Sequence, residues 1–207
     1  MRDRDLVRLY WPVELRPAFD ALFAIDDVMA EVVASSSQPA LGAIRLAWWR
    51  EALERLDSSP PPPEPRLNAA AAQLLPRGVG GAALAGLEDG WATLFDEQPD
   101  IERIRARGAR LFALAAQLLE ASDPLLESAG RLYGYTDMAR RGLAEPYWPM
   151  EEMHRLARHC FTRRLRPLTG LAKLAARDAR WDRAFEPEAT PGRAAALLSH
   201  RFFGVVA

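Results

Sequence analysis

The chain has 207 residues, of which 49% are hydrophobic and 27% are charged, ordinary values for a globular protein. This length favours one domain, and the composition excludes a chain that is disordered throughout. The 27 basic and 28 acidic residues leave a net charge of −1, which argues against nucleic-acid binding, because such proteins usually carry a clear basic excess.

The N-terminal part of the chain has the periodicity of two helices. Apolar residues recur at helical steps from Leu15 to Val33, and residues 35–38 (SSSQ) interrupt the pattern. Pro39 suits the first turn of the second helix. Trp48 and Trp49 are adjacent, so only one of the two indoles can point squarely into the core. The second helix carries Leu41, Ile44, Trp48 and Ala52 on one face, with Trp49, Leu53 and Leu56 beside them.

A proline-rich stretch at residues 57–65 predicts an extended loop, because the consecutive prolines at 60–63 cannot continue a helix. The helical pattern resumes on both sides, so we expect one domain over residues 1–207. We also expect Pro167 to kink or end the helix that carries residues 153–161. No run of alternating β-branched residues predicts a strand. The expected fold class is therefore all-α, with seven or eight helices.

Carboxylates on the first helix carry the clearest chemical signal, since HExxH, P-loop, GxGxxG and GxSxG motifs do not occur. Asp20, Asp27 and Glu31 lie on one helical face, and Asp26 falls on the apolar stripe itself. Oxygen ligands at such spacing suit Mg²⁺. The plain alternative is a solvated acidic face with Asp26 near its edge.

The single cysteine, Cys160, excludes an internal disulfide and a thiolate metal cluster within one chain. We expect it to be a small buried apolar residue. No apolar run reaches the roughly 18 residues of a membrane span, and the first residues lack the apolar core of a signal peptide. These features predict a cytoplasmic protein, and they are compatible with peripheral contact to a membrane.

Several blocks of the sequence resemble the squalene/phytoene synthase family. They are residues 10–24, 39–53, 130–140 with 147–149, and 164–176, and the RLAWWREAL stretch at 45–53 is the most specific. The resemblance implies an all-α isoprenoid-synthase fold around a central cavity. Enzymes of the family join two prenyl diphosphates head to head. Two aspartate-rich helices hold Mg²⁺, which binds the diphosphate leaving group.

Most acidic residues of that family's two motifs are replaced in this sequence. In an alignment without gaps, Glu31 is the only acid left in the first motif, and a shift of about four residues pairs it with Asp27. In the second motif Arg141 stands where a carboxylate is expected, and its positive charge would repel the cation. Asp137 and Glu145 are the remaining acids near that motif.

Three hypotheses follow. We favour a non-catalytic member without a cofactor, close to the branch that includes assembly factors of respiratory complex I, which would bind a prenyl diphosphate, another lipid or a protein partner. The alternative is an active Mg²⁺-dependent prenyltransferase acting on farnesyl or geranylgeranyl diphosphate. The third is a helical interaction module without a cavity.

Each hypothesis has its candidate residues. An active enzyme would use Asp27, Glu31, Asp137 and Glu145, with Asp27 and Glu31 as metal ligands. The expected substrate-binding residues are Arg45, Tyr133, Arg140 and Arg141. A separate basic cluster is either a solvated face or a contact for anionic lipid or diphosphate. It comprises Arg163, Arg164 and Arg166.

Overall fold

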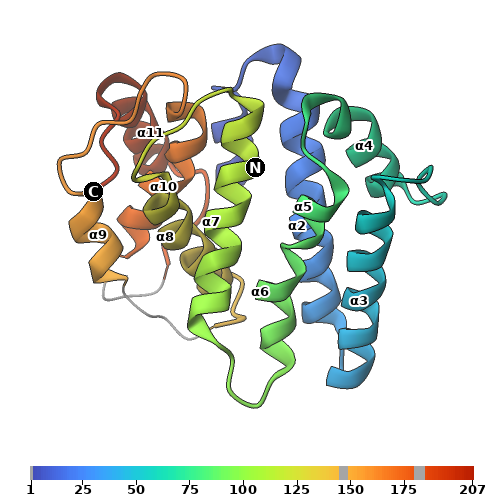
Figure 1. Ribbon diagram of the computed structural model, residues 1–207. Helices are drawn as coiled ribbons and strands as arrows, with labels where there is room; N and C mark the ends of the chain where they lie inside the picture. Colours follow the sequence, from blue (N-terminus) through green and yellow to red (C-terminus); the bar gives the residue numbers. More distant parts are fainter. Residues whose placement is uncertain (1, 145–148, 180–184) are drawn as a thin grey trace.

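The computed structural model describes residues 2–144, 149–179 and 185–207 (Figure 1). The all-α prediction is confirmed, because these residues form helices and no strand, apart from an isolated bridge between Cys160 and Val205. They contain eleven α-helices, more than the seven or eight expected, since several predicted segments are divided by turns. The α-helices are α1 (Asp3–Arg8), α2 (Arg16–Ser35), α3 (Pro39–Arg55), α4 (Pro65–Gln73), α5 (Gly81–Ala85), α6 (Glu88–Ala92), α7 (Ile101–Leu118), α8 (Leu126–Arg140), α9 (Met150–Leu156), α10 (Arg166–Asp178) and α11 (Pro191–Phe203). Three short 3-10 helices accompany them, at Val13–Leu15, Leu75–Arg77 and Thr93–Phe95.

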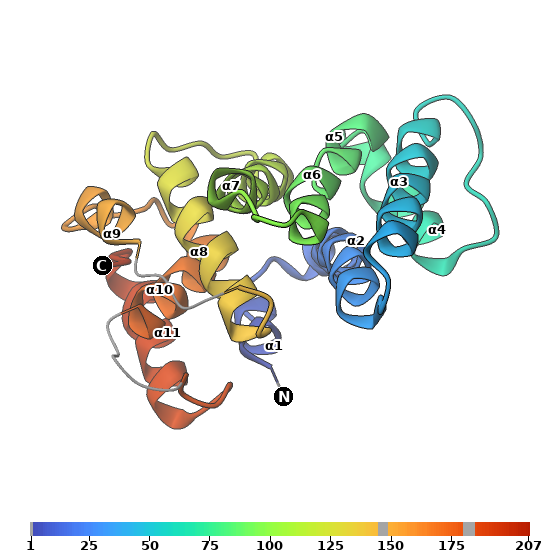
Figure 2. The same ribbon diagram turned by 90° about the horizontal axis from the view of Figure 1, so that it is seen from below.

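The helices form two groups that lie side by side (Figure 2). One group contains α2 to α6, and the other contains α1 and α8 to α11. Helix α7 joins them, because it packs against α6 and α2 on one side and α8 on the other. Buried apolar side chains from both groups belong to one continuous core. Within the described residues, no helix is both long enough and apolar enough to cross a bilayer.

Helices α7 and α8 approach one another at a contact made of glycines. A Cβ atom on Gly108 would lie 2.2 Å from the carbonyl oxygen of Gly130 and 2.5 Å from the Cα of Gly134. Atoms cannot come this close, so a side chain at Gly108 would force the helices apart. This contact determines how closely α8 and its acidic residue Asp137 approach α7.

Prolines begin several helices, as the sequence suggested for Pro39. The prediction for Pro167 was wrong, because this residue lies in the first turn of α10 and the preceding helix, α9, ends at Leu156. Proline is tolerated in a first turn, where its missing N–H has no partner within the helix. Cys160 lies between the two helices and is exposed, so the expectation that it is buried was also wrong.

Helix α3 buries mainly the residues beside the face that carries Leu41, Ile44 and Trp48. Leu41, Ile44 and Trp48 remain 55%, 65% and 43% exposed, and we call these three residues the α3 apolar stripe. Trp49 is buried, which confirms that only one of the paired indoles enters the core. Ala52 is buried as well. The other buried residues of α3 are Gly42, Leu46 and Leu53.

Candidate functional site

Arginines form ion pairs with the carboxylates of the acidic face predicted on α2. Asp20 accepts two hydrogen bonds from Arg8 of α1, at 2.6 and 2.7 Å. Glu31 accepts from Arg66 of α4 at 2.8 and 3.0 Å. Both pairs are largely exposed, so each contributes only about 0–1 kcal/mol to stability. These carboxylates are therefore not gathered around a common point.

Asp27 is the most strongly bound acid of that face. Arg4 of α1 donates to its Oδ2, Arg141 donates to its Oδ1 at 2.9 Å, and Arg2 lies 3.9 Å away. Burial alone would raise the pKa of Asp27, but the hydrogen bonds and charges of Arg4 and Arg141 outweigh it and hold the pKa below its ordinary value. Asp27 is thus an ionised carboxylate whose charge is already compensated.

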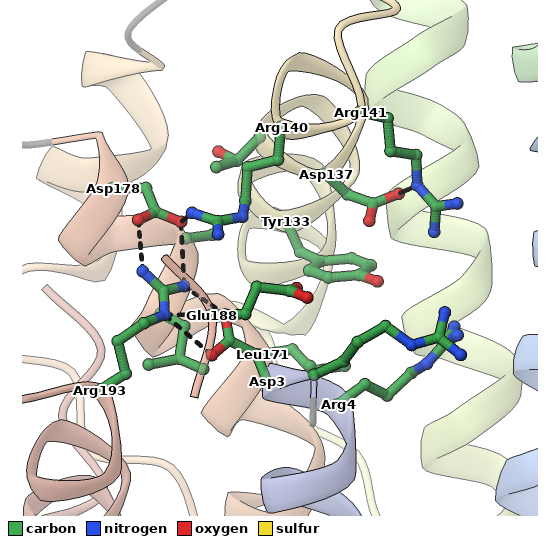
Figure 3. Close-up of a pocket in the computed structure, with 14 residues that line it drawn as sticks. Asp3, Arg4, Tyr133, Asp137, Arg140, Arg141, Leu171, Asp178, Glu188 and Arg193 are labelled. Carbon is green, nitrogen blue, oxygen red and sulfur yellow. Dashed lines mark hydrogen bonds and ion pairs between the residues drawn. The ribbon is translucent and has the colours of Figure 1, made fainter. Parts of the chain in front are cut away.

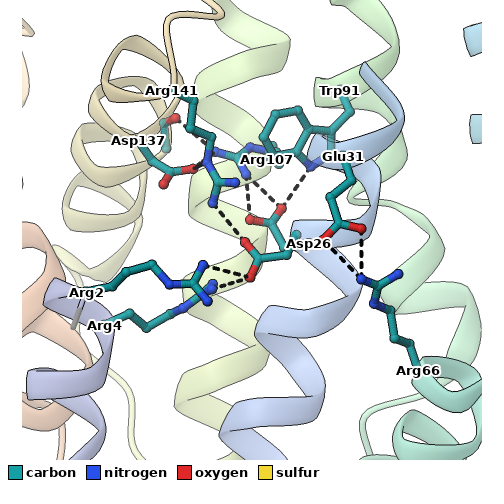
Figure 4. Close-up of polar contacts among 11 residues, drawn as sticks. Arg2, Arg4, Asp26, Glu31, Arg66, Trp91, Arg107, Asp137 and Arg141 are labelled. Carbon is teal, nitrogen blue, oxygen red and sulfur yellow. Dashed lines mark hydrogen bonds and ion pairs between the residues drawn. The ribbon is translucent and has the colours of Figure 1, made fainter. Parts of the chain in front are cut away.

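Arg141 connects the two helices that the sequence marked as acidic. It follows the last residue of α8, and its Nη2 donates to Asp27 of α2 while its Nε donates to Asp137 of α8 at 3.0 Å (Figure 4). Burial would lower the pKa of Arg141, but neighbouring carboxylates, Asp137 foremost, raise it above its ordinary value. The arginine therefore remains charged between the two acids.

Asp26 belongs to a buried ion pair that the sequence did not predict. Nη1 of Arg107 on α7 lies 2.7 Å from each carboxylate oxygen, and Trp91 Nε1 donates to Oδ1 at 2.9 Å (Figure 4). Arg107 Nη2 donates to the carbonyl of Gly134 and lies 3.3 Å from Asp137. The side chains of Asp26 and Arg107 are inaccessible to solvent, so the solvated acidic face was the wrong interpretation of Asp26.

A signal for this pair was present in the sequence. Arg107 lies three residues after Ile104 and four before Leu111, so it shares the apolar face of α7 as Asp26 shares that of α2. Two opposite charges on two apolar faces can compensate one another in a core. The two residues are 81 positions apart in the sequence, however, and helical periodicity does not predict contacts at that separation.

Four of the predicted residues line one pocket of about 400 Å³, which we call the α8–α10 pocket (Figure 3). They are Tyr133, Asp137, Arg140 and Arg141. Burial raises the pKa of Tyr133 above its ordinary value, and the charge of Asp137 acts in the same direction. Its hydroxyl therefore stays protonated and can donate a hydrogen bond. The opposite wall is apolar and consists of Leu171, Leu174 and Ala175 of α10.

A second buried ion-pair network closes one end of this pocket. Arg193 of α11 donates to Asp3 of α1 at 2.8 and 2.9 Å and to Asp178 of α10 at 2.5 and 3.1 Å (Figure 3). Arg140 donates to the same Asp178 at 3.0 Å. The network fixes α1, α10 and α11 around the pocket, and the sequence offered no motif that pointed to it.

The remaining predicted residues lie elsewhere. Arg45 is exposed on α3 and donates to the hydroxyls of Ser35 and Ser36 at 3.3 and 3.4 Å, so it lies beside the turn between α2 and α3. It does not line the α8–α10 pocket. Asp27 lines a smaller pocket of about 210 Å³, to which Arg4 also contributes. Glu145 lies outside the described residues.

The arrangement of these acids does not fit Mg²⁺. The ion takes several oxygen ligands, but Asp27 and Asp137 already share Arg141, and Glu31 pairs with Arg66. Within the part of the chain that the structure describes, no three His, Cys, Asp or Glu side chains are grouped to hold a metal ion.

Comparison with known proteins adds no name to this site. No model of a protein family, no curated protein and no solved structure matches the chain.

Proposed function

We propose that this chain is a non-catalytic relative of the squalene/phytoene synthases that binds an anionic isoprenoid or other lipid in the α8–α10 pocket without a metal. The observation that carries the proposal is the position of Arg141, which hydrogen-bonds both Asp27 and Asp137. In an active enzyme these carboxylates would face Mg²⁺. Here a guanidinium provides the positive charge instead.

The composition of the pocket supports an anionic, amphiphilic ligand. Five arginines and four carboxylates line it, so positive charge slightly exceeds negative charge at its polar side. Guanidinium groups bind phosphate through paired N–H donors, and the apolar wall of α10 would receive a hydrocarbon chain. A protein partner in an assembly role would use the α3 apolar stripe, because its three side chains are exposed.

The test is to titrate the protein with farnesyl and geranylgeranyl diphosphate, with and without Mg²⁺. We expect saturable binding that does not need Mg²⁺, and no release of diphosphate. The double variant Arg2→Gln/Arg141→Gln should weaken binding about 10-fold or more, since each guanidinium hydrogen bond to an anion contributes about 1.5–3 kcal/mol. Arg77→Gln, which changes an exposed arginine in the 3-10 helix after α4, is the matched control.

Two outcomes would overturn the proposal. Release of diphosphate that requires Mg²⁺ and is abolished by Glu31→Gln and by Asp137→Asn would identify an active prenyltransferase. Absence of binding to either diphosphate, with or without Mg²⁺, would favour a helical interaction module instead.

A further inference from the structure

A second pocket, also of about 400 Å³, lies at the first turns of α10, whereas the proposed ligand site lies along its later turns. We call it the α10–α11 pocket. Arg166, Pro167 and Gly170 of α10 line it together with Leu197 of α11 and Tyr10, which follows α1. The remaining lining residues include Arg163 and Arg201. Three arginines from two segments of the chain therefore line one cavity together with apolar residues.

No carboxylate of the described residues balances the charges of this pocket. Among the residues that the structure describes, no Asp or Glu lines it. Arg163, Arg166 and Arg201 form no ion pair with a described carboxylate, whereas all five arginines of the α8–α10 pocket do. Like charges that converge without a counter-ion repel one another, and a bound anion would remove this repulsion.

Two of the arginines are held in fixed positions. Arg166 donates its Nε to the carbonyl of Phe161 at 3.0 Å, and its Nη1 to the carbonyls of Arg201 and Phe202 at 2.9 and 2.8 Å. The guanidinium of Arg201 stacks on the ring of Tyr10, 4.8 Å from its centroid. Stacking uses the face of the guanidinium and leaves its in-plane N–H donors for a ligand.

Exposed apolar side chains occur at the pocket and next to its lining residues in the sequence. Phe202 lines the pocket and is 67% exposed, and the next residue, Phe203, is 68% exposed. Leu9 and Leu198 adjoin lining residues in the sequence and are also exposed. Aromatic and apolar side chains beside arginines are typical of surfaces that lie at the interface between a membrane and water.

We propose that the α10–α11 pocket binds the phosphate head group of an anionic membrane lipid. Arg163, Arg166 and Arg201 would surround the phosphate, while Phe202 and Phe203 enter the interfacial layer of the bilayer. The site is separate from the α8–α10 pocket, so the proposal does not depend on the function proposed above.

The test measures binding of the full chain to vesicles of phosphatidylcholine, alone and mixed with phosphatidylglycerol. We expect binding only to the mixed vesicles. Arg163→Gln/Arg201→Gln should weaken it about 30-fold, because an arginine near an anionic surface contributes about 1 kcal/mol. The matched control Arg55→Gln/Arg77→Gln removes two exposed positive charges elsewhere and should change binding by less than about 3-fold. Arg166 is left intact, because it also caps α11.

Phe202→Ser is a second variant that should not disturb the fold, since this side chain is exposed. It should also weaken binding to the mixed vesicles. An equal loss in both arginine double variants would show attraction by diffuse charge and would overturn the proposal. Saturable binding of inorganic phosphate without any binding to vesicles would overturn it as well, because the anion site would then serve a soluble ligand.

Discussion

Arginine side chains determine the electrostatics of this protein at the scale of single residues. Asp26, Asp27, Asp137 and Asp178 are buried or half-buried acids, and each lies against at least one guanidinium. A carboxylate that leaves water without a partner is strongly destabilising. The same pairing that stabilises these acids in the fold makes them poor ligands for a divalent cation.

The buried pair of Asp26 and Arg107 should be the most sensitive of these contacts. Replacing Arg107→Met leaves a carboxylate in the core with Trp91 as its remaining hydrogen-bond donor. We expect the free energy of unfolding to fall by about 3–5 kcal/mol, measured by denaturation in urea.

The double variant Asp26→Leu/Arg107→Met is the control for that experiment. It removes both charges and fills their space with apolar side chains, so we expect it to recover most of the lost stability. If Arg107→Met alone costs less than about 1 kcal/mol, the pair is not buried in solution as the structure shows.

His200 should make stability depend on pH. Burial lowers its pKa to about 4 from an ordinary value of 6.5, and the charges of Lys173 and Arg166 act in the same direction. The unfolded chain therefore binds a proton at a higher pH than the folded chain does. The free energy of unfolding should fall by about 2 kcal/mol between about pH 7.5 and about pH 5, and this contribution levels off below about pH 4.

Denaturation of the wild type and of His200→Gln at both pH values isolates this contribution. The variant has no titratable group at this position, so its stability should change less over the range. Equal losses in the two proteins would assign the titration to another group.

At the scale of elements, α3 shows that hydrophobic periodicity does not by itself choose the buried face. Its sequence carries two apolar stripes side by side, one with Leu41, Ile44 and Trp48 and the other with Leu46, Trp49 and Leu53. Packing against α5 and against Phe95 selects the second stripe. Gly42 is buried with this stripe, and its lack of a side chain lets the Phe95 ring approach, because a Cβ there would overlap the ring.

A pair of substitutions tests this choice of face. Leu46→Ala should lower the free energy of unfolding by about 2–5 kcal/mol, since the side chain is fully buried. Ile44→Ala, two residues away and exposed, should change it by less than about 0.5 kcal/mol. Chemical denaturation of both variants measures the two effects, and the reverse order of effects would mean that the stripe with Ile44 is the buried one.

At the scale of the whole molecule, the glycine contact between α7 and α8 joins the two groups of helices. It also brings Arg107 of α7 close to Asp137 of α8. The buried charges thus depend on a backbone approach that larger residues would prevent.

Gly134→Ala should therefore destabilise the protein. The new Cβ would lie 2.6 Å from the Cα of Gly108, a backbone atom that cannot rotate away. We expect a loss of about 1–3 kcal/mol in the free energy of unfolding. Gly86→Ala is the control, because its nearest neighbour is the flexible end of Arg110 and the cost should be smaller. Equal stability of Gly134→Ala and the wild type would contradict the close contact.

The all-α class, the helix that begins at Pro39 and the proline-rich loop after it follow from the sequence alone, although Pro65 already belongs to α4. These features depend on local chemistry, namely proline geometry and apolar spacing along one helix. The sequence also named Asp27 and Asp137 as acids of an active enzyme and Arg141 as a substrate-binding residue, but it did not predict the ion pairs that join them.

How these groups meet depends on the packing of the helices. Asp27 and Arg141 are 114 residues apart, and Asp26 and Arg107 are 81 apart. Their pairing depends on where whole helices pack, which the spacing within a single helix does not encode. The same reason applies to the α10–α11 pocket, because Arg163 and Arg166 are close in sequence but Arg201 joins them only where α10 and α11 pack together.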